Sequence, residues 1–128
     1  MNIKGIAWIG IVSDDPEVRR FYTSTLQLQV MDEADSYAYY AVDAVTRLEI
    51  LASASGTAKL QRSNAPAVGF LVDDIAASVQ ELKEDGVHLL TDIKEWRSGE
   101  VVHRWVYFND PAGNTLLLLE RHGEEHTP

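Results

Sequence analysis

The fold is decided near the end of the chain by the stretch FNDPAGN, residues 108–114, which is followed by the apolar run TLLLLE, residues 115–120. Pro111 holds its own φ near the value that a turn needs, and Gly113 reaches positive φ without a steric cost. The apolar residues on both sides of the turn have the composition of β-strands. We therefore expect a strand, a tight turn and a second strand in this region.

The chain also contains a weak internal repeat. The segment GIVSDD at residues 10–15 is echoed by GFLVDD at residues 69–74, an offset of 59 residues. In each copy a short apolar strand ends at a pair of acids, and a helical pattern follows with one of the acids as its N-cap. Pro16 suits the first turn of the first helix, and Gly86 suits the end of the second. The two halves therefore share one plan.

Each half is predicted to follow a βαβββ order. The expected strands are residues 5–12, 28–31, 36–42 and 47–51 in the first half, and 68–72, 87–92, 100–108 and 114–120 in the second. The expected buried helix positions are Val18, Phe21, Tyr22 and Leu26, and then Ile75, Val79 and Leu82. One such unit cannot bury its sheet alone, so the two pack together in one α+β domain. Within residues 1–128 we expect module one at about 3–51, a linker at 52–66, module two at about 67–120 and a polar tail at 121–128.

Composition excludes several classes of function. The chain has 128 residues with a formal charge of −9, and an acidic surface repels the phosphates of nucleic acids. It has no cysteine, and hence neither disulfides nor a thiolate nucleophile. No apolar run is long enough to span a bilayer, and the N-terminus lacks the pattern of a signal peptide. We therefore expect a soluble, cytoplasmic protein without nucleic-acid or membrane partners.

Taken together, these features resemble the vicinal oxygen chelate superfamily, which includes glyoxalase I, the extradiol dioxygenases and the bleomycin-resistance proteins. The resemblance covers residues 5–120 and rests on the strand, the acids and the FY pair of residues 5–22, on FLVDDI at 70–75, and on the turn at 110–114. Gln27 stands where a glycine is usual in this family. The resemblance implies two βαβββ modules around a cupped sheet. It also implies a homodimer with ligand clefts at or near its interface.

The resemblance also allows a check for the family's metal site. Metal-dependent members hold a divalent ion with a histidine on the first strand and a carboxylate on the last strand of each module. The histidine positions fall at Ala7 or Trp8 and at Ala67, and the carboxylate positions fall at Glu49 and Leu117. Only Glu49 is a metal-ligating residue type, and a lone carboxylate binds a divalent ion weakly. We therefore expect no metal and no other cofactor, and we place the chain nearest to the metal-free bleomycin-resistance branch.

Aromatic residues gather on the strands that would line the cup. Tyr37 and Tyr39 share one face of their strand because side chains alternate with a period of two. The residues expected to bind a ligand are Trp8, Tyr37, Tyr39, Glu49, Trp96, His103, Trp105 and Tyr107. Aromatic walls offer stacking and cation–π contacts, and a carboxylate in the cup offers an anchor for a cationic group. Aromatic strand residues are also common in ordinary protein cores, which is the competing explanation.

Two functional hypotheses follow. The first is a metal-independent protein that binds a small aromatic or cationic molecule in the cup, for sequestration or resistance, without catalytic residues. The second is a lyase, isomerase or dioxygenase of the same superfamily with a non-standard site around Glu49 and His103, using either a divalent metal or acid–base chemistry. The missing metal-ligating residues favour the first hypothesis. A third hypothesis is a regulatory or scaffolding domain that binds no small molecule of its own. Glu120 is expected to point away from the cup, because it alternates with Leu117 and Leu119.

Overall fold

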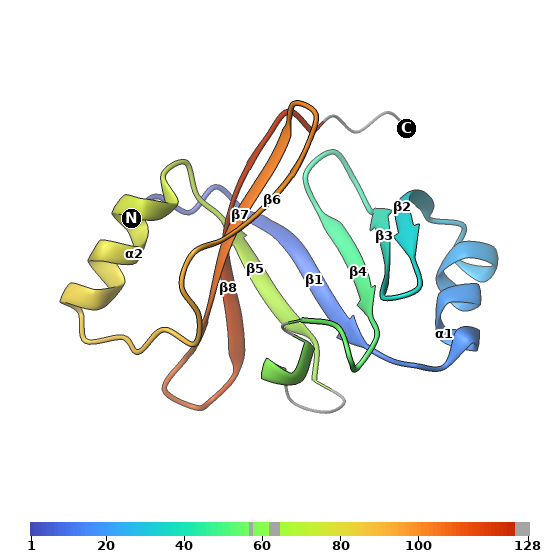
Figure 1. The fold of residues 1–128 in the computed structure, drawn as a ribbon, viewed down its shortest axis with the longest axis horizontal. Coiled ribbons are helices and arrows are strands. Elements are labelled where there is room, and N and C mark those ends of the chain that lie inside the picture. Colours follow the sequence, from blue (N-terminus) through green and yellow to red (C-terminus); the bar gives the residue numbers. More distant parts are fainter. Residues whose placement is uncertain (57, 62–64, 125–128) are drawn as a thin grey trace.

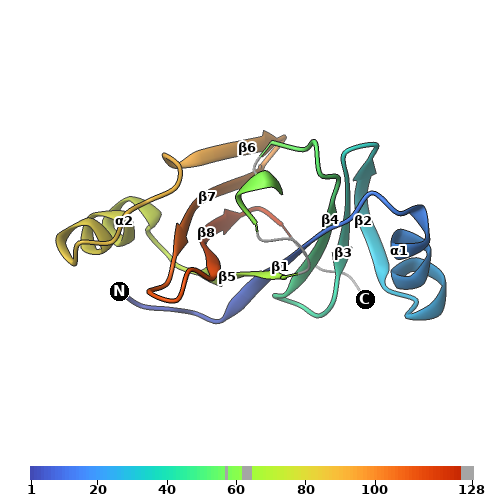
Figure 2. The same cartoon turned by 90° about the horizontal axis from the view of Figure 1, so that it is seen from below.

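The computed structural model describes residues 1–56, 58–61 and 65–124 and contains one curled sheet flanked by two helical segments (Figures 1 and 2). Its elements in chain order are β1 (Ile6–Val12), α1 (Pro16–Arg20), η1 (Phe21–Thr25), β2 (Gln29–Ala34), β3 (Tyr37–Ala41), β4 (Arg47–Leu51), η2 (Ala58–Leu60), β5 (Ala67–Leu71), α2 (Ile75–Glu84), β6 (Lys94–Ser98), β7 (Val101–Asn109) and β8 (Thr115–His122). Across these described residues the strand order in the sheet is β2-β3-β4-β1-β5-β8-β7-β6.

The sheet is built from two βαβββ halves that join through their first strands. In the first half β1 pairs with β4 in parallel, and in the second half β5 pairs with β8 in parallel. The halves meet where β1 and β5 run antiparallel to each other. Figure 2 shows the sheet curling so that β6 and β7 lie opposite β3 and β4 across its concave side. The predicted α+β fold with two βαβββ units is confirmed.

The helices begin and end at the residues that the repeat indicated. The Asp15 carboxylate accepts a hydrogen bond from the amide of Glu17, and the Asp74 carboxylate accepts one from Ala77. Both are N-cap interactions, which satisfy amides that have no partner within the helix. Gly86 follows α2 with a φ of 77°. Gln27, at the equivalent place in the first half, has a φ of 57° although it carries a side chain.

Three details of the prediction are wrong. Residues 87–92 form no named strand; Leu89 makes an isolated bridge to Phe108, and the second strand of this half is β6. The apolar pattern there arises because Val87 and Leu89 pack on the core beneath α2. The second is the strand predicted at 28–31, because β2 runs from Gln29 to Ala34 and so ends three residues later than predicted.

The third error concerns the first helix. Phe21 and Leu26 are 47% and 50% exposed, whereas Val18 and Tyr22 pack against the core as expected. The helix changes from α to π geometry at Phe21, and the wider π turn removes the 3.6-residue spacing on which the predicted stripe relied. At the other end of the chain, β8 continues to His122, two residues past the predicted end, and residues 125–128 of the expected tail lie outside the described residues.

The core divides according to the two faces of the sheet. On the convex side, Ile75 and Val79 of α2 pack with Val72 and with residues of β7 and β8, and a smaller group around Tyr40 and Ile50 packs beneath α1 and η1. On the concave side lies a separate cluster that includes Trp8, Tyr107, Leu117 and Leu119. Helices α1 and α2 therefore cover the convex face, whereas the short η2 lies on the concave side and contributes to the cavity there. Within the described part of the chain, no helix has the length and apolar character needed to cross a membrane.

Candidate ligand-binding cavity

The concave face encloses a cavity of about 1080 Å³. All eight residues predicted to bind a ligand contribute to its walls, namely Trp8, Tyr37, Tyr39, Glu49, Trp96, His103, Trp105 and Tyr107. They come from β1, β3, β4, β6 and β7, so both halves of the sheet supply them. The structure brings the predicted residues together; that they bind a ligand stays a prediction. A second hollow of about 810 Å³ lies outside the cup, along α2 and residues 87–94.

Trp8 lies across the middle of the cavity floor because two glycines make room for it. A Cβ atom at Gly10 would overlap the indole ring, and a Cβ at Gly69 would lie 3.1 Å from the Trp8 Cβ and 2.8 Å from a Leu117 methyl group. The indole meets the Tyr107 ring edge to face, with centroids 6.3 Å apart. Gly10 and Gly69 are the repeated glycines of the sequence, so the repeat serves the floor of the cup as well as the fold.

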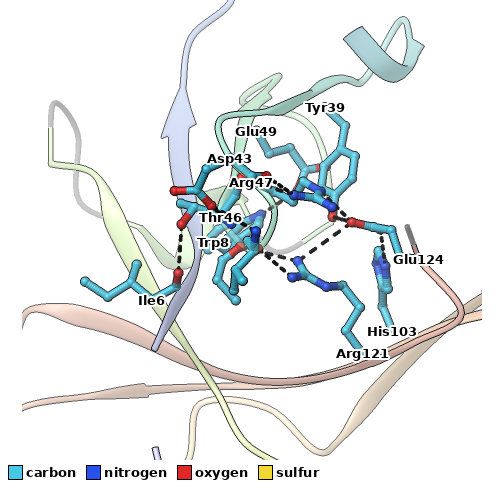
Figure 3. Close-up of polar contacts among 12 residues, drawn as sticks. Ile6, Trp8, Tyr39, Asp43, Thr46, Arg47, Glu49, His103, Arg121 and Glu124 are labelled. Carbon is cyan, nitrogen blue, oxygen red and sulfur yellow. Dashed lines mark hydrogen bonds and ion pairs between the residues drawn. The ribbon is translucent and has the colours of Figure 1, made fainter. Parts of the chain in front are cut away.

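Glu49 is one of the acids that line the cavity, together with Asp32 and Glu124. Its Oε1 accepts a hydrogen bond of 2.9 Å from the Trp8 indole N–H, as Figure 3 shows. Burial raises the pKa of Glu49, the Trp8 hydrogen bond lowers it and the charge of Asp32 raises it, with a resulting value of about 7. Among the described residues, Glu49 receives no other hydrogen bond. Its carboxyl group therefore changes protonation state near neutral pH and retains a free acceptor oxygen.

The remaining wall residues form two groups of contacts. Tyr37 donates a hydrogen bond of 2.6 Å to Asp32, and this bond raises the pKa of Tyr37 to about 12. The His103 ring of β7 makes tilted contacts with Trp96 of β6, at 5.3 Å, and with Tyr39 of β3, at 6.0 Å between ring centroids. Trp96 is 41% exposed, which places it at the mouth of the cavity. The aromatic residues thus line both the interior and the entrance.

The polar cluster around Glu124 was missed by the sequence analysis, which assigned this residue to a polar tail. Its carboxylate bonds to Arg47 at 2.5 Å, to His103 at 2.7 Å and to the Tyr39 hydroxyl at 3.2 Å, and it lies 3.8 Å from Arg121 (Figure 3). Burial opposes ionisation, but the hydrogen bond and charge of His103 and the charges of Arg121 and Arg47 lower the pKa of Glu124 to about 2. The only advance signal was the alternation of β8, which places Arg121 on the same face as Leu117 and Leu119.

The strand register resolves where the family's four metal-ligand positions fall. Gly10 pairs with Glu49, and Gly69 pairs with Leu117 in the same parallel arrangement. The residues two places before these glycines are Trp8 and Ala67, and Trp8, not Ala7, contributes to the cavity wall. The predicted register of β8 is confirmed as well. Leu117 lines the cavity, while Glu120 bonds to the amide of Ile75 at the start of α2.

These four positions do not fit a divalent ion. An indole, a methyl group and an isobutyl group supply no lone pair for a metal, so Glu49 would be a single ligand. Across the described residues, no group of three or more histidines and acids lies close enough together to hold a metal ion. His103, the alternative ligand considered from the sequence, is bonded to Glu124 instead.

Comparison with known families agrees with this architecture. Residues 5–118 match the family model described as the glyoxalase/bleomycin resistance protein/dioxygenase superfamily. The chain belongs to this superfamily. No functionally curated protein matches it closely enough to add a specific activity.

Similar solved structures share the fold at low sequence identity. A Streptomyces coelicolor methylmalonyl-CoA epimerase variant in complex with 2-nitronate-propionyl-CoA has a TM-score of 0.74 at 21% identity, covering 95% of this chain and 100% of that one. The Mycobacterium tuberculosis methylmalonyl-CoA epimerase has a TM-score of 0.68 at 22% identity, covering 92% and 88%. A superfamily member from Vibrio splendidus 12B01 has a TM-score of 0.63 at 15% identity, covering 94% and 99%. The expected placement nearest to the metal-free bleomycin-resistance branch is not supported, because the similar structures include several epimerases and no particular branch stands out.

Proposed function

We propose that this superfamily member binds a small aromatic molecule in its cup without a divalent metal, and that Glu49 anchors a cationic or hydrogen-bond-donating group of that molecule. The observation that carries the proposal is a partly satisfied carboxyl group on the floor of an aromatic-walled cavity. Pockets of this kind combine apolar walls with a few polar groups that orient the guest. Sequestration of such a molecule requires no further chemistry.

The walls favour a flat guest over an aliphatic one. Tyr39, Trp96 and Trp105 are among the aromatic residues that line the cavity, and ring stacking adds to the free energy gained from burial alone. A cationic ring gains further from the quadrupoles of these residues and from the Glu49 carboxylate. The net charge of −9 adds attraction at longer range.

Tryptophan fluorescence tests the proposal directly, because all three tryptophans of the chain line the cavity. Nicotinamide and 1-methylnicotinamide share a ring, and methylation of the ring nitrogen gives the second compound a permanent positive charge. We expect saturable quenching by both in the presence of EDTA, with the cation binding more tightly. Glu49→Gln is expected to weaken the cation about tenfold, a change of about 1.4 kcal/mol, and to leave nicotinamide unchanged. Glu100→Gln, at the β6–β7 turn outside the cavity, is the charge-matched control.

Two results would overturn the proposal. One is linear, unsaturable quenching by both compounds, which would mean that the cup does not bind aromatic guests. The other is a stoichiometric divalent metal in elemental analysis of the purified protein, which would support the metal-dependent hypothesis instead.

Oligomeric state is a separate question that the same purified protein can answer. We propose a homodimer, supported by the exposure of Ile6, Val42 and Val45 at one end of the sheet, and light scattering at twice the monomer mass is the expected result.

A second candidate function is acid–base catalysis, favoured by the pKa of about 7 at Glu49. A general base works best when its pKa lies near the working pH, and Tyr39 is its neighbour across the β3–β4 pairing. Several similar structures are methylmalonyl-CoA epimerases, whose name denotes inversion at a carbon centre. The test is deuterium incorporation into methylmalonyl-CoA in D₂O. Incorporation that is lost in Glu49→Gln supports this candidate, and none in the wild type excludes that substrate.

A further inference from the structure

Glu124 occupies a place where a ligand carboxylate would be expected. The side chain is 7% exposed, lies at the wall of the cavity and receives hydrogen bonds from Arg47, His103 and Tyr39. These donors come from β4, β7 and β3, so three separate strands converge on one carboxylate. Guanidinium, imidazole and phenol donors around one anion are the composition of a carboxylate-binding site.

The two arginines beside the Glu124 carboxylate are also held in position by hydrogen bonds to the backbone. The Arg47 guanidinium also donates to the carbonyl oxygens of Asp43 and Thr46, at 2.9 Å and 3.3 Å. Arg121 donates to the carbonyl oxygens of Ala7 and Val45, from the next inward-facing position after Leu119. These backbone contacts fix the orientation of both arginines whether or not Glu124 is bound. The site is therefore preorganised, which reduces the cost of binding an anion.

Glu124, by contrast, lies outside the sheet. Strand β8 ends at His122, and Gly123 follows it with a φ of 76°. Displacement of the Glu124 carboxylate therefore breaks no strand pairing. Arg47 is only 1% exposed and is absent from the cavity wall, whereas Glu124 forms part of that wall. Glu124 thus stands between the cavity and the arginine behind it.

We propose that Tyr39, Arg47, His103 and Arg121 form a carboxylate-binding subsite of the cup, which Glu124 occupies as an internal ligand until a guest carboxylate replaces it. The inference rests on the proposed binding function of the cup and adds an anionic group to the class of guest. The exchange replaces one desolvated carboxylate with another, so the buried arginines keep a counterion throughout. An internal competitor lowers the apparent affinity of the guest by the fraction of time for which the subsite is open.

The experiment compares nicotinate with nicotinamide, which differ in the carboxylate alone, by isothermal titration calorimetry. Glu124→Gln removes the internal anion while keeping the side-chain shape. We expect nicotinate to bind Glu124→Gln at least tenfold more tightly than the wild type, with nicotinamide unchanged. Glu120→Gln is the matched control, because Glu120 bonds to Arg104 and His122 on the convex side. It loses the same charge four residues away and is expected to leave nicotinate binding at the wild-type value.

A second probe separates this subsite from the aromatic cup. Acetate carries the carboxylate without a ring, and its binding is measured as a saturable shift of the His103 ring signals in NMR. We expect the shift in Glu124→Gln and in Glu124→Ala, and no shift in the wild type at the same acetate concentrations. Folding of each variant is checked by urea unfolding, and Glu124→Ala covers the case in which the glutamine amide refills the site.

The outcomes distinguish the two proposals. If nicotinamide binds but neither nicotinate tightening nor an acetate shift appears in the folded Glu124 variants, the carboxylate subsite is overturned and the aromatic cup stands. If acetate shifts His103 in the variants while no pyridine binds, the subsite stands and the aromatic cup is overturned. A tightening of the same size in Glu120→Gln would show a general effect of net charge, and it would also overturn the subsite.

Discussion

The two modules build the same half-cup and equip it differently. In module one Tyr39 pairs with Glu49 across β3 and β4; in module two Tyr107 pairs with Leu117 across β7 and β8. Each pair lies 68 residues from its counterpart, so the aromatic position is repeated and the acid position is not. On the first strands, Trp8 faces the cavity where Ala67 stands in the second module. The acid at this position thus belongs to module one alone, whereas module two contributes His103, and Glu124 after β8, to the cavity wall.

This difference shows which parts of the repeat serve the fold. Both modules keep the glycine beneath the indole, the acidic N-cap and the alternation that separates concave from convex side chains. These features create the curled sheet. A side chain that faces the cup can be substituted without affecting them. The same fold can therefore carry different binding residues at equivalent positions of its two modules.

The largest expected effect comes from substitution of Arg47, the arginine of module one that pairs with Glu124. Arg47 is buried, and its equivalent 68 residues later is Thr115, which bonds to the carbonyl oxygen of Leu60. Arg47→Met leaves Glu124 without its closest counterion, so we expect a loss of about 3–5 kcal/mol of unfolding free energy. Thr115→Val removes one neutral hydrogen bond, at about 1 kcal/mol. Urea unfolding measures both, and equal losses would contradict the asymmetry between the modules.

The second expected effect is the pH dependence of stability caused by Glu49. Its folded pKa of about 7 lies above the ordinary value of 4.5, so the folded state holds the proton more tightly than the unfolded chain. The resulting stabilisation is complete below pH 4.5 and disappears as the pH rises towards 7. The loss is about 3 kcal/mol at 1.36 kcal/mol per unit.

Glu49→Gln isolates this contribution, because other groups, Glu124 among them, titrate in both proteins. We expect the difference in unfolding free energy between wild type and Glu49→Gln to change by about 3 kcal/mol between pH 4.5 and 7, in the direction that favours the variant at pH 7. Urea unfolding at several pH values measures it. A constant difference over this range would mean that Glu49 is solvated like a surface carboxylate.

Much of this architecture could be anticipated from the sequence, and the reasons are local. The turn at 110–114, the acidic caps and the period-two alternation each depend on a few neighbouring residues, and the wall residues of β3 and β7 followed from the alternation. The Glu124 cluster depends on four strands meeting in space, for which one sequence offers no local pattern. The exposure of Phe21 was missed because a π turn leaves no clear mark in a run such as FYTST.

A third variant removes the difference between the modules at the metal-ligand positions. A chain with Trp8→His, Ala67→His and Leu117→Glu, together with native Glu49, carries the four ligand types of the family's metal-dependent members. We expect it to bind Zn²⁺ and to gain about 2.7 kcal/mol of stability at a free ion concentration of one hundred times Kd. Thermal unfolding and elemental analysis measure this. The same chain with Glu49→Gln should bind less tightly, and an absence of binding by the full set would contradict the register assigned to β1 and β8.

The smallest expected effect concerns the residue of positive φ that follows the C-cap of the helical segment in each module. The modules differ there in a way unrelated to ligands. Gln27 and Gly86 are 59 residues apart, and both have positive φ, at 57° and 77°. A side chain in this region costs about 1–2 kcal/mol, part of which glycine gives back through its greater freedom in the unfolded chain. Gln27→Gly should therefore stabilise the protein by about 0.5–1 kcal/mol. Gly86→Gln should destabilise it by a similar amount, because a Cβ at Gly86 meets no other atom within 4 Å and only the backbone cost remains. Urea unfolding of both variants checks the pair, and changes of the same sign would show that the two helix ends are not equivalent.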